Sequence, residues 1–329
     1  MKITFKDVGQ GDSILLEWNH DNLDKIGIID CSKKGKSNPV LEHIQVKGYK
    51  QIEFLILSHP HADHYSGMYE LLNHCVKNNI TVNNFYHTSI GIGPNYWKYF
   101  EIDTKDNELF GKLMGLIVEL SQKNIIEIRY LNLDTRIDLF PDAFLHCISP
   151  SHDEILECQK IMKFDPATHK KEQSSAANYL STIFKLKIGD KYALLTSDAE
   201  ILAFHTIIQK RDKLFENEEL ILSQMSHHGS YKNYDDNFWS RALKINNSPA
   251  VASAGKNDKY KHPHLETLQA FKEHNYSIHC TSNLYGMEKY VELMTEISYI
   301  GRKMDTFSEE AEEYYIYGDK VFIWNDLIK

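Results

Sequence analysis

Several features are scarce or missing in this chain of 329 residues, and each absence excludes a class of protein. No run of about 18 apolar residues occurs, so the sequence predicts no membrane-spanning helix and no membrane partner. The first residues enter a strand pattern directly, without the charged and apolar segments of a signal peptide. Only five cysteines are present, scattered and odd in number, which favours reduced thiols in a cytoplasmic protein over a disulfide framework.

Positive charge is also in short supply. The formal net charge is −9, which gives no support for the basic face that a nucleic-acid-binding protein usually carries. Two lysine-containing segments, 33–36 and 256–261, are local exceptions, and each by itself is typical of a solvated loop. The hydrophobic content of 42% and the charged content of 25% are ordinary for a soluble globular protein.

Strand and helix patterns alternate along the chain, which indicates an α/β fold formed as a single domain over residues 1–329. A less regular stretch at about 88–134 is expected to be a helical elaboration beside the site. A C-terminal extension at about 284–329 is expected to begin with a helix. Two hairpins are also expected, one from 178–188 and 192–196 and one over 314–324.

The densest cluster of ligand-type side chains follows a short apolar strand predicted at 55–57. His59 and His61 alternate along an extended segment, so their imidazoles can point the same way. Asp63 and His64 follow where the chain turns, and can face a second point nearby. Imidazole and carboxylate together suit Zn, Mn or Fe, and the absence of cysteine from the cluster argues against a closed structural zinc site.

Other predicted strands also end in polar residues and are followed by helix-like segments. Asp30 ends one strand, where it is either a partner to a metal-bound histidine or a turn cap. Asp198 follows a second strand, His227-His228 follow a third, and His262-Pro263-His264 follow a fourth. Strand ends of this kind assemble a site along one edge of a layered α/β fold.

These motifs resemble the metallo-β-lactamase superfamily, which implies a four-layered αββα sandwich, here with a helical insertion and a C-terminal extension. The HxHxDH signature is present as His59-Pro60-His61-Ala62-Asp63-His64. Finer details are similar to the soluble domain of the ComEC DNA-uptake family and its stand-alone relatives, including phosphorylcholine esterases. The segments that carry this resemblance are Asp7-Val8-Gly9-Gln10-Gly11-Asp12-Ser13, Leu194-Leu195-Thr196-Ser197-Asp198-Ala199-Glu200, His227-His228-Gly229-Ser230 and His262-Pro263-His264.

The resemblance implies a site for two divalent ions, Zn or Mn. His59 and His61 would bind the first ion, Asp63 and His64 the second, and Asp198 both. One of His227 and His228 would complete the second site while the other contacts substrate, and the sequence leaves open which is which. The residues to which the resemblance gives a part in catalysis are Asp63, His227 and His264.

One ligand of the superfamily has no match in this chain. A further histidine is expected between the 140s and the 180s, but Asn178 stands at the corresponding strand entry, where it is expected to contact substrate. This departure leaves the identity of the metal open. The remaining predicted substrate-binding residues are Ser230, beside the Gly229 amide, and His262 and His264, one of which can bind the phosphate or protonate the leaving oxygen.

The leading hypothesis is a phosphodiesterase or nuclease that uses a hydroxide activated by two metal ions, with DNA or RNA as substrate. An alternative is hydrolysis of a small phosphodiester, such as a nucleotide signal or a phosphocholine-type ester. Amide or thioester hydrolysis, as in lactamases, and a non-catalytic binding module are further alternatives. The sequence leaves homo-oligomers and protein partners open.

Overall fold

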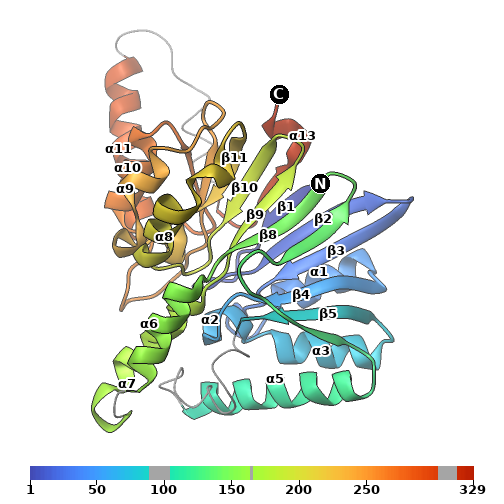
Figure 1. The fold of residues 1–329 in the computed structure, drawn as a ribbon. Coiled ribbons are helices and arrows are strands. Elements are labelled where there is room, and N and C mark those ends of the chain that lie inside the picture. The colour runs from blue at the N-terminus through green and yellow to red at the C-terminus, as the bar shows by residue number, and fades with distance from the viewer. Residues whose placement is uncertain (89–103, 164–165, 303–316) are drawn as a thin grey trace.

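Two seven-stranded sheets face each other and carry helices on their outer sides, giving a four-layered αββα sandwich (Figure 1). The structure is a computed structural model that describes the chain except residues 89–103, 164–165 and 303–316. Within the described ranges, no helix is both long and apolar enough to cross a membrane.

The first sheet has the strand order β14-β1-β2-β3-β4-β5-β6. Pairing is antiparallel from β14 to β3 and parallel from β3 to β6. The strands are β1 (Lys2–Phe5), β2 (Ile14–His20), β3 (Leu23–Ile29), β4 (Gln51–Leu57), β5 (Thr81–His87), β6 (Glu127–Tyr130) and β14 (Lys320–Ile323).

The second sheet repeats this arrangement in the order β13-β12-β11-β10-β9-β8-β7. Pairing is antiparallel from β7 to β10 and parallel from β10 to β13. The strands are β7 (Arg136–Phe140), β8 (Ala143–Ser149), β9 (Ile183–Ile188), β10 (Lys191–Leu195), β11 (Glu219–Gln224), β12 (Pro249–Ala252) and β13 (Ser277–Cys280).

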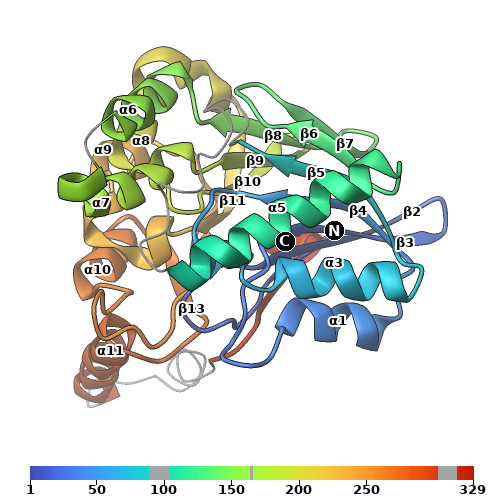
Figure 2. The same ribbon diagram turned by 90° about the horizontal axis from the view of Figure 1, so that it is seen from below.

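Three helices cover the outer face of the first sheet and lie side by side when the molecule is seen from below (Figure 2). They are α1 (Pro39–Lys47), α3 (Met68–Lys77) and α5 (Thr104–Gln122), and α2 (Ala62–Tyr65) is a single turn in the loop after β4. The sequence sets the bounds of α1, because Asn38 accepts a hydrogen bond from the Leu41 amide and Gly48 ends the helix at φ 70°.

The other helices lie mainly over the second sheet and its connections (Figure 1). The α-helices are α6 (His152–Met162), α7 (Pro166–Ser175), α8 (Ile201–Arg211), α9 (Asp236–Trp239), α10 (Leu265–Glu273), α11 (Gly286–Arg302) and α13 (Trp324–Leu327). The 3₁₀ turns are η2 (Ala176–Leu180), η3 (Asp212–Phe215), η4 (Ser226–Gly229) and η5 (Tyr231–Asn233).

Three apolar clusters hold the four layers together. The middle cluster lies between the sheets and includes the fully buried Ile56, Leu145 and Leu186. The outer clusters join each sheet to its helices, with Leu113 on the α5 side and Trp239 on the α9 side. Full burial of one such side chain contributes roughly 1.5–3 kcal/mol, so these clusters provide the rigid frame for the loops at the strand ends.

One local prediction from the sequence is wrong, and another cannot be compared with the structure over its whole length. The strand expected from 178 begins only at Ile183, because residues Ala176–Leu180 form the 3₁₀ turn η2. The expected hairpin over 314–324 falls partly outside the described residues, and its last strand, β14, pairs with β1. The described part of 88–134 supplies α5 and β6, the edge strand of the first sheet, and the segment 284–329 supplies α11, β14 and α13.

Candidate metal centre

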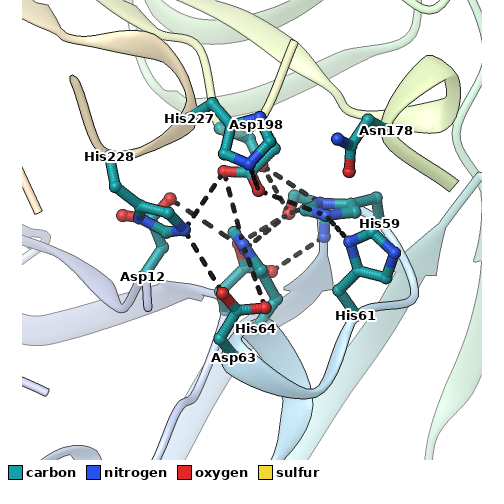
Figure 3. A network of polar contacts seen from close by, with 12 residues as sticks. Asp12, His59, His61, Asp63, His64, Asn178, Asp198, His227 and His228 are labelled. Atoms are coloured by element: carbon teal, nitrogen blue, oxygen red, sulfur yellow. Dashed lines mark hydrogen bonds and ion pairs between the residues drawn. The ribbon is translucent and has the colours of Figure 1, made fainter. Parts of the chain in front are cut away.

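Loops from both sheets meet at one edge of the sandwich and bring histidines and carboxylates together (Figure 3). His59, His61, Asp63 and His64 follow β4, and Asp198 follows β10. His227 and His228 follow β11 in η4. Since β4 and β10 each run parallel to a neighbouring strand whose carboxyl end lies at the same edge, the fold gathers these polar side chains there.

Asp198 lies at the centre of the cluster, and its two carboxylate oxygens face different histidines. Oδ2 lies 3.7 Å from Nε2 of His59 and 3.5 Å from Nε2 of His227. Oδ1 lies 3.5 Å from Nε2 of both His64 and His228. A carboxylate placed in this way can be shared by two neighbouring cation positions.

Asp63 adds a second carboxylate on the His64 and His228 side. Its Oδ2 lies 3.3 Å from Nε2 of His228, and its Oδ1 lies 3.9 Å from Nε2 of His64. Ligand atoms of Asp63, His64 and His228 all lie within 4.8 Å of one another. The same limit holds for His59, His64 and Asp198.

Hydrogen bonds hold the imidazoles with one ring nitrogen directed toward the centre. Nδ1 of His64 lies 2.7 Å from Oδ2 of Asp30, and Nδ1 of His228 lies 2.8 Å from the Ser253 carbonyl oxygen. Such bonds at the far nitrogen fix the orientation of metal-binding histidines. Asp30 therefore orients the ring of His64, which is one of the two roles that the sequence leaves open for it.

Two hydrogen-bonded serines, Ser58 after β4 and Ser197 after β10, connect the loops that follow these two strands. The Ser58 amide donates to Oδ1 of Asp30 over 2.8 Å, and its hydroxyl donates to Oδ2 over 2.6 Å. The Ser197 hydroxyl donates to Oγ of Ser58 over 2.8 Å. Asp30 thus fixes the start of the loop that carries His59 as well as the ring of His64.

Several atoms at the centre are buried but have no hydrogen-bond partner among the described residues: Nε2 of His64, Nε2 of His228 and Oδ1 of Asp198. Buried polar atoms in a native fold are normally paired, and atoms that bind an ion are a known kind of exception. Imidazole nitrogens and carboxylate oxygens directed at a common point are the donors that divalent transition metals prefer. The residues present therefore fit a divalent cation.

The charges of the cluster also favour a cation. Burial lowers the pKa of His64, but the carboxylates of Asp198 and Asp30 outweigh burial and hold that pKa well above its ordinary value. Burial raises the pKa of Asp198, but His227, His228 and His64 together hold it well below its ordinary value. The buried carboxylates thus stabilise positive charge at this point, as they would stabilise a bound ion.

Asp12 is a component of the cluster to which the sequence interpretation gave no role. It is buried, Oδ2 accepts a hydrogen bond of 2.9 Å from Nε2 of Gln224, and a ligand atom of Asp12 lies within 4.8 Å of ligand atoms of Asp198 and His228. Burial raises the pKa of Asp12 to about 6. The sequence did contain one signal for Asp12, because this acid stands at the end of the glycine-rich turn 9–11 and shortly before β2.

The structure distinguishes the paired histidines, which the sequence left open. His228 is buried and faces Oδ1 of Asp198 together with Asp63, whereas the His227 side chain is 24% exposed and faces Oδ2. Both backbones are left-handed, with φ values of 49° and 58°. Backbone conformations of this kind in non-glycine residues cluster at functional sites.

Asn178 lies beside His59 and His61 (Figure 3). Its Nδ2 donates to Oε1 of Glu200 over 3.0 Å, whereas its Oδ1 is buried without a partner among the described residues. Nε2 of His59 lies 3.1 Å from Nδ1 of His61. An amide oxygen, a neutral donor, therefore stands on the side of the cluster where the superfamily's further histidine was expected.

The His262-Pro263-His264 segment lies next to the cluster, but its two histidines have different surroundings. The His262 ring is buried, with its centroid 5.5 Å from that of His227 and 6.1 Å from that of His228. Nδ1 of His264 accepts a hydrogen bond of 3.1 Å from the Tyr231 amide. This placement favours a positioning role for His264 over the catalytic role that the sequence predicts.

Ser230 is also buried beside the cluster, and its amide donates to the His227 carbonyl oxygen over 3.0 Å. Burial and the neighbouring His228 and His227 lower the pKa of His262 to about 3, which makes its imidazole neutral.

Comparison with known proteins agrees with this geometry. The sequence profile of the metallo-β-lactamase superfamily matches residues 9–125, which hold the HxHxDH motif. Over that segment the chain is similar to this superfamily, and its αββα sandwich is the fold of metal-dependent hydrolases that generally bind divalent metals.

The chain is also similar to part of a longer bacterial protein. It is 24% identical over 286 residues to ComE operon protein 3 of Bacillus subtilis (strain 168), a match that covers 82% of this chain and 30% of that protein. The chain therefore spans less than a third of the length of this relative.

Two solved structures have a similar fold at low sequence identity. The metallo-β-lactamase-fold protein YhfI from Bacillus subtilis is 11% identical, with a TM-score of 0.45 and coverage of 87% of this chain and 97% of YhfI. A diphosphatase from the PhnP family is 12% identical, with a TM-score of 0.44 and coverage of 85% of this chain and 94% of the diphosphatase.

Proposed function

We propose that this protein is a metal-dependent phosphodiesterase that cleaves nucleic acid, either DNA or RNA. The observation that carries the proposal is the Asp198 carboxylate, whose two oxygens face two separate sets of histidines. A carboxylate placed in this way can hold two ions close together, as in-line cleavage of a phosphodiester by a two-metal site requires.

The proposal divides the candidate ligands between two ion positions. His59, His61 and Asp198 would hold one ion, with the Asn178 amide oxygen beside them. Asp63, His64, His228 and Asp198 would hold the other, and Asp12 lies within reach of this second position. Divalent ions bound there, Zn or Mn, supply the Lewis acidity that activates water near neutral pH and neutralises charge on the phosphoryl oxygens.

The chain itself offers no thiol nucleophile at this site. All five cysteines are buried and unpaired, and burial raises the pKa of the Cys147 thiol to about 12. The Ser197 hydroxyl, which is near the centre, is buried and donates to Ser58. Water is therefore the attacking group that this set of residues supports.

Residues around the cluster would bind and orient the phosphodiester. The neutral imidazole of His262 can donate a hydrogen bond from one ring nitrogen to a phosphoryl oxygen. The Ser230 side chain lies on the same loop as His228 and can provide a further polar contact to the phosphodiester. Asp30 keeps the ring of His64 in place while charge builds up on the phosphate.

The preference for a phosphodiester over an amide or a thioester rests on the His227-His228-Gly229-Ser230 and His262-Pro263-His264 motifs. Both are details of the ComEC-like branch that the chain resembles. His227 lies 3.5 Å from Asp198, and the His262 ring lies next to the rings of His227 and His228. Nucleic acid is preferred to a small phosphodiester because of the same resemblance, although the net charge of −9 opposes a polyanion at long range.

The test is hydrolysis of bis-p-nitrophenyl phosphate by metal-stripped protein to which Mn or Zn is returned. The wild-type protein should hydrolyse this ester only when metal is present. In Asp198→Ala, kcat/KM should fall at least about 100-fold, because both metal positions lose a ligand. Asp138→Ala, an exposed carboxylate on β7, is the matched control and should behave as wild type.

A β-lactam and a thioester tested in parallel separate the reaction classes. Turnover of either in preference to the phosphodiester, or equal phosphodiesterase activity in Asp198→Ala, would overturn the proposal.

A further inference from the structure

Two tyrosine rings stand exposed on either side of the His262-Pro263-His264 segment. Tyr231 is 51% exposed and Tyr260 is 47% exposed. Tyr231 follows directly after the His227-His228-Gly229-Ser230 motif, and Tyr260 lies two residues before His262. Single exposed aromatic residues are common on protein surfaces, so the position of these two matters more than their exposure.

A continuous series of ring contacts joins both tyrosines to the candidate metal centre. The His262 centroid lies 6.1 Å from that of His228 and 5.8 Å from that of Tyr260, whose ring is inclined by only 20° to it. The His264 centroid lies 4.8 Å from that of His262 and 4.8 Å from that of Tyr231. Two ring contacts therefore connect Tyr260 to the candidate metal ligand His228, and three connect Tyr231 to it.

The backbone holds both tyrosines in place. The Tyr231 amide donates to Nδ1 of His264 over 3.1 Å, and the Tyr260 amide donates to Oδ1 of Asn257 over 3.1 Å. The His264 amide donates to the Gly229 carbonyl oxygen over 3.0 Å, which ties the two loops together. The rings are thus presented to solvent from a braced backbone, as a stacking platform requires.

Lysines accompany both rings. Nζ of Lys259 lies 4.4 Å from the Tyr260 ring centroid, and Nζ of Lys232 lies 6.0 Å from that of Tyr231. The Lys259 ammonium also donates a hydrogen bond of 2.6 Å to the Tyr260 hydroxyl, so positive charge lies close to the rings on which the bases of a strand would stack.

The fold also joins the two lysine-containing segments that are far apart in the sequence. Lys33, Lys34 and Lys256 line one open groove of about 670 Å³. The groove-lining residue Gly255 belongs to the loop that also carries Ser253, whose carbonyl oxygen lies 2.8 Å from Nδ1 of His228. Lys33 and Lys34 have acidic partners, Glu70 and Asp7, whereas Lys256 is exposed.

We propose that Tyr231 and Tyr260 stack on unpaired bases of a single-stranded nucleic acid, and that Lys256 and Lys259 bind its phosphates beside the scissile one. The inference rests on the proposed phosphodiesterase function and specifies its substrate as a strand with unpaired bases. Stacking on aromatic rings combined with a cationic track is how proteins bind single strands without reading sequence.

The experiment measures binding of a fluorescent oligothymidylate and of an abasic oligomer of equal length by anisotropy, in EDTA so that no cleavage occurs. Tyr231→Ala with Tyr260→Ala should weaken oligothymidylate binding by about 5- to 100-fold and leave binding of the abasic oligomer nearly unchanged. The matched Tyr231→Phe with Tyr260→Phe protein should retain binding, because phenyl rings still stack.

Lys256→Ala provides the complementary result. It should weaken the binding of both oligomers equally and reduce the salt dependence, the slope of log K against log salt, by about 0.7. Equal binding of the two oligomers by wild type, or an equal loss for both in the tyrosine double variant, would overturn the proposal.

The failure of this inference can be distinguished from failure of the proposed function. Metal-dependent turnover of bis-p-nitrophenyl phosphate without any base-dependent binding would refute only the stacking platform. Base-dependent binding without turnover by any metal would support the platform and refute the phosphodiesterase.

Discussion

Asp30 shows how a residue outside the candidate ligand set can control metal affinity. Its carboxylate accepts from the Ser58 amide and lies 2.7 Å from Nδ1 of His64, so it orients one candidate ligand and the loop that carries another. Asp30→Asn removes the charge but keeps the size. We expect it to lower the affinity for Mn or Zn about 10- to 100-fold, as measured by calorimetric titration.

Asp142→Asn is the control for that measurement, because Asp142 is an exposed residue in the turn after β7. Its metal affinity should equal that of wild type. An unchanged affinity in Asp30→Asn would mean that His64 is held by other contacts.

Glu17 provides a test of electrostatics far from the metal centre. Burial raises the pKa of this carboxyl, but hydrogen bonds from His43, Lys2 and Tyr49 outweigh burial and lower it from 4.5 to about 2. Because the folded-state pKa is depressed, its contribution to stability is present above about pH 4.5 and is lost as the pH falls toward 2.

We therefore predict that Glu17→Gln lowers the free energy of unfolding by about 2 kcal/mol at pH 7, after allowance for the partial exposure of Lys2. The difference from wild type should shrink as urea unfolding is repeated from pH 5 down to pH 3. A difference that does not depend on pH would contradict the assigned charge interaction. Glu119→Gln, on the exposed face of α5, should have little effect at either pH.

The sequence was sufficient to identify the candidate site residues that lie within motifs. It was insufficient to identify those that only the fold brings to the site. His59, His64, Asp198 and His228 stand in recognisable patterns, and the structure gathers them as expected. Asp12 joins them through a long-range contact in which its amide donates to the Asp63 carbonyl oxygen over 3.0 Å. No local pattern encodes that contact.

At the scale of elements, the turn between β1 and β2 depends on close contact with the loop after β12. A Cβ atom added at Gly255 would lie 2.2 Å from the Gly9 carbonyl carbon and 2.5 Å from the Gln10 nitrogen. Gly255→Ala must therefore displace this turn. We predict a loss of about 1–3 kcal/mol in the free energy of unfolding, together with weaker metal binding because Asp12 moves.

Gly111→Ala is the matched control in α5. A Cβ atom there meets nothing within 4 Å, and the residue lies inside the helix. This substitution should raise the free energy of unfolding by up to about 1 kcal/mol and leave metal binding unchanged. If Gly255→Ala were as stable as wild type, the packing of the turn would not be what fixes Asp12.

Element predictions from the sequence were accurate where a periodic pattern and a cap coincided. The residue pattern over 39–46 predicts a helix, and the structure has α1 at Pro39–Lys47, with Asn38 and Gly48 at its ends. The strand expected from 178 was wrong because its first residues are held elsewhere: Asn178 donates to Glu200 and the Thr88 hydroxyl donates to the Leu180 carbonyl oxygen. Tertiary contacts of this kind override local propensity.

For the whole molecule, bound metal should contribute to stability because the ligands come from both sheets. His64 follows β4 in the first sheet, whereas Asp198 and His228 follow β10 and β11 in the second. An ion that binds only the folded state at 100 times its Kd adds about 2.7 kcal/mol. We predict that adding Mn or Zn to metal-stripped protein raises Tm by a few degrees in calorimetry.

The same addition to Asp198→Ala should raise Tm much less. An equal rise in both proteins would place the stabilising ion elsewhere on the chain.

The account as a whole depends on two ions that act together on a phosphodiester. The most direct measurement titrates metal-stripped protein with Mn or Zn and follows the initial rate of bis-p-nitrophenyl phosphate hydrolysis against equivalents of metal added. The account predicts a rate that rises with metal and saturates near two equivalents. Saturation at one equivalent would contradict the shared role of Asp198, and no turnover at any metal content would contradict the phosphodiesterase itself.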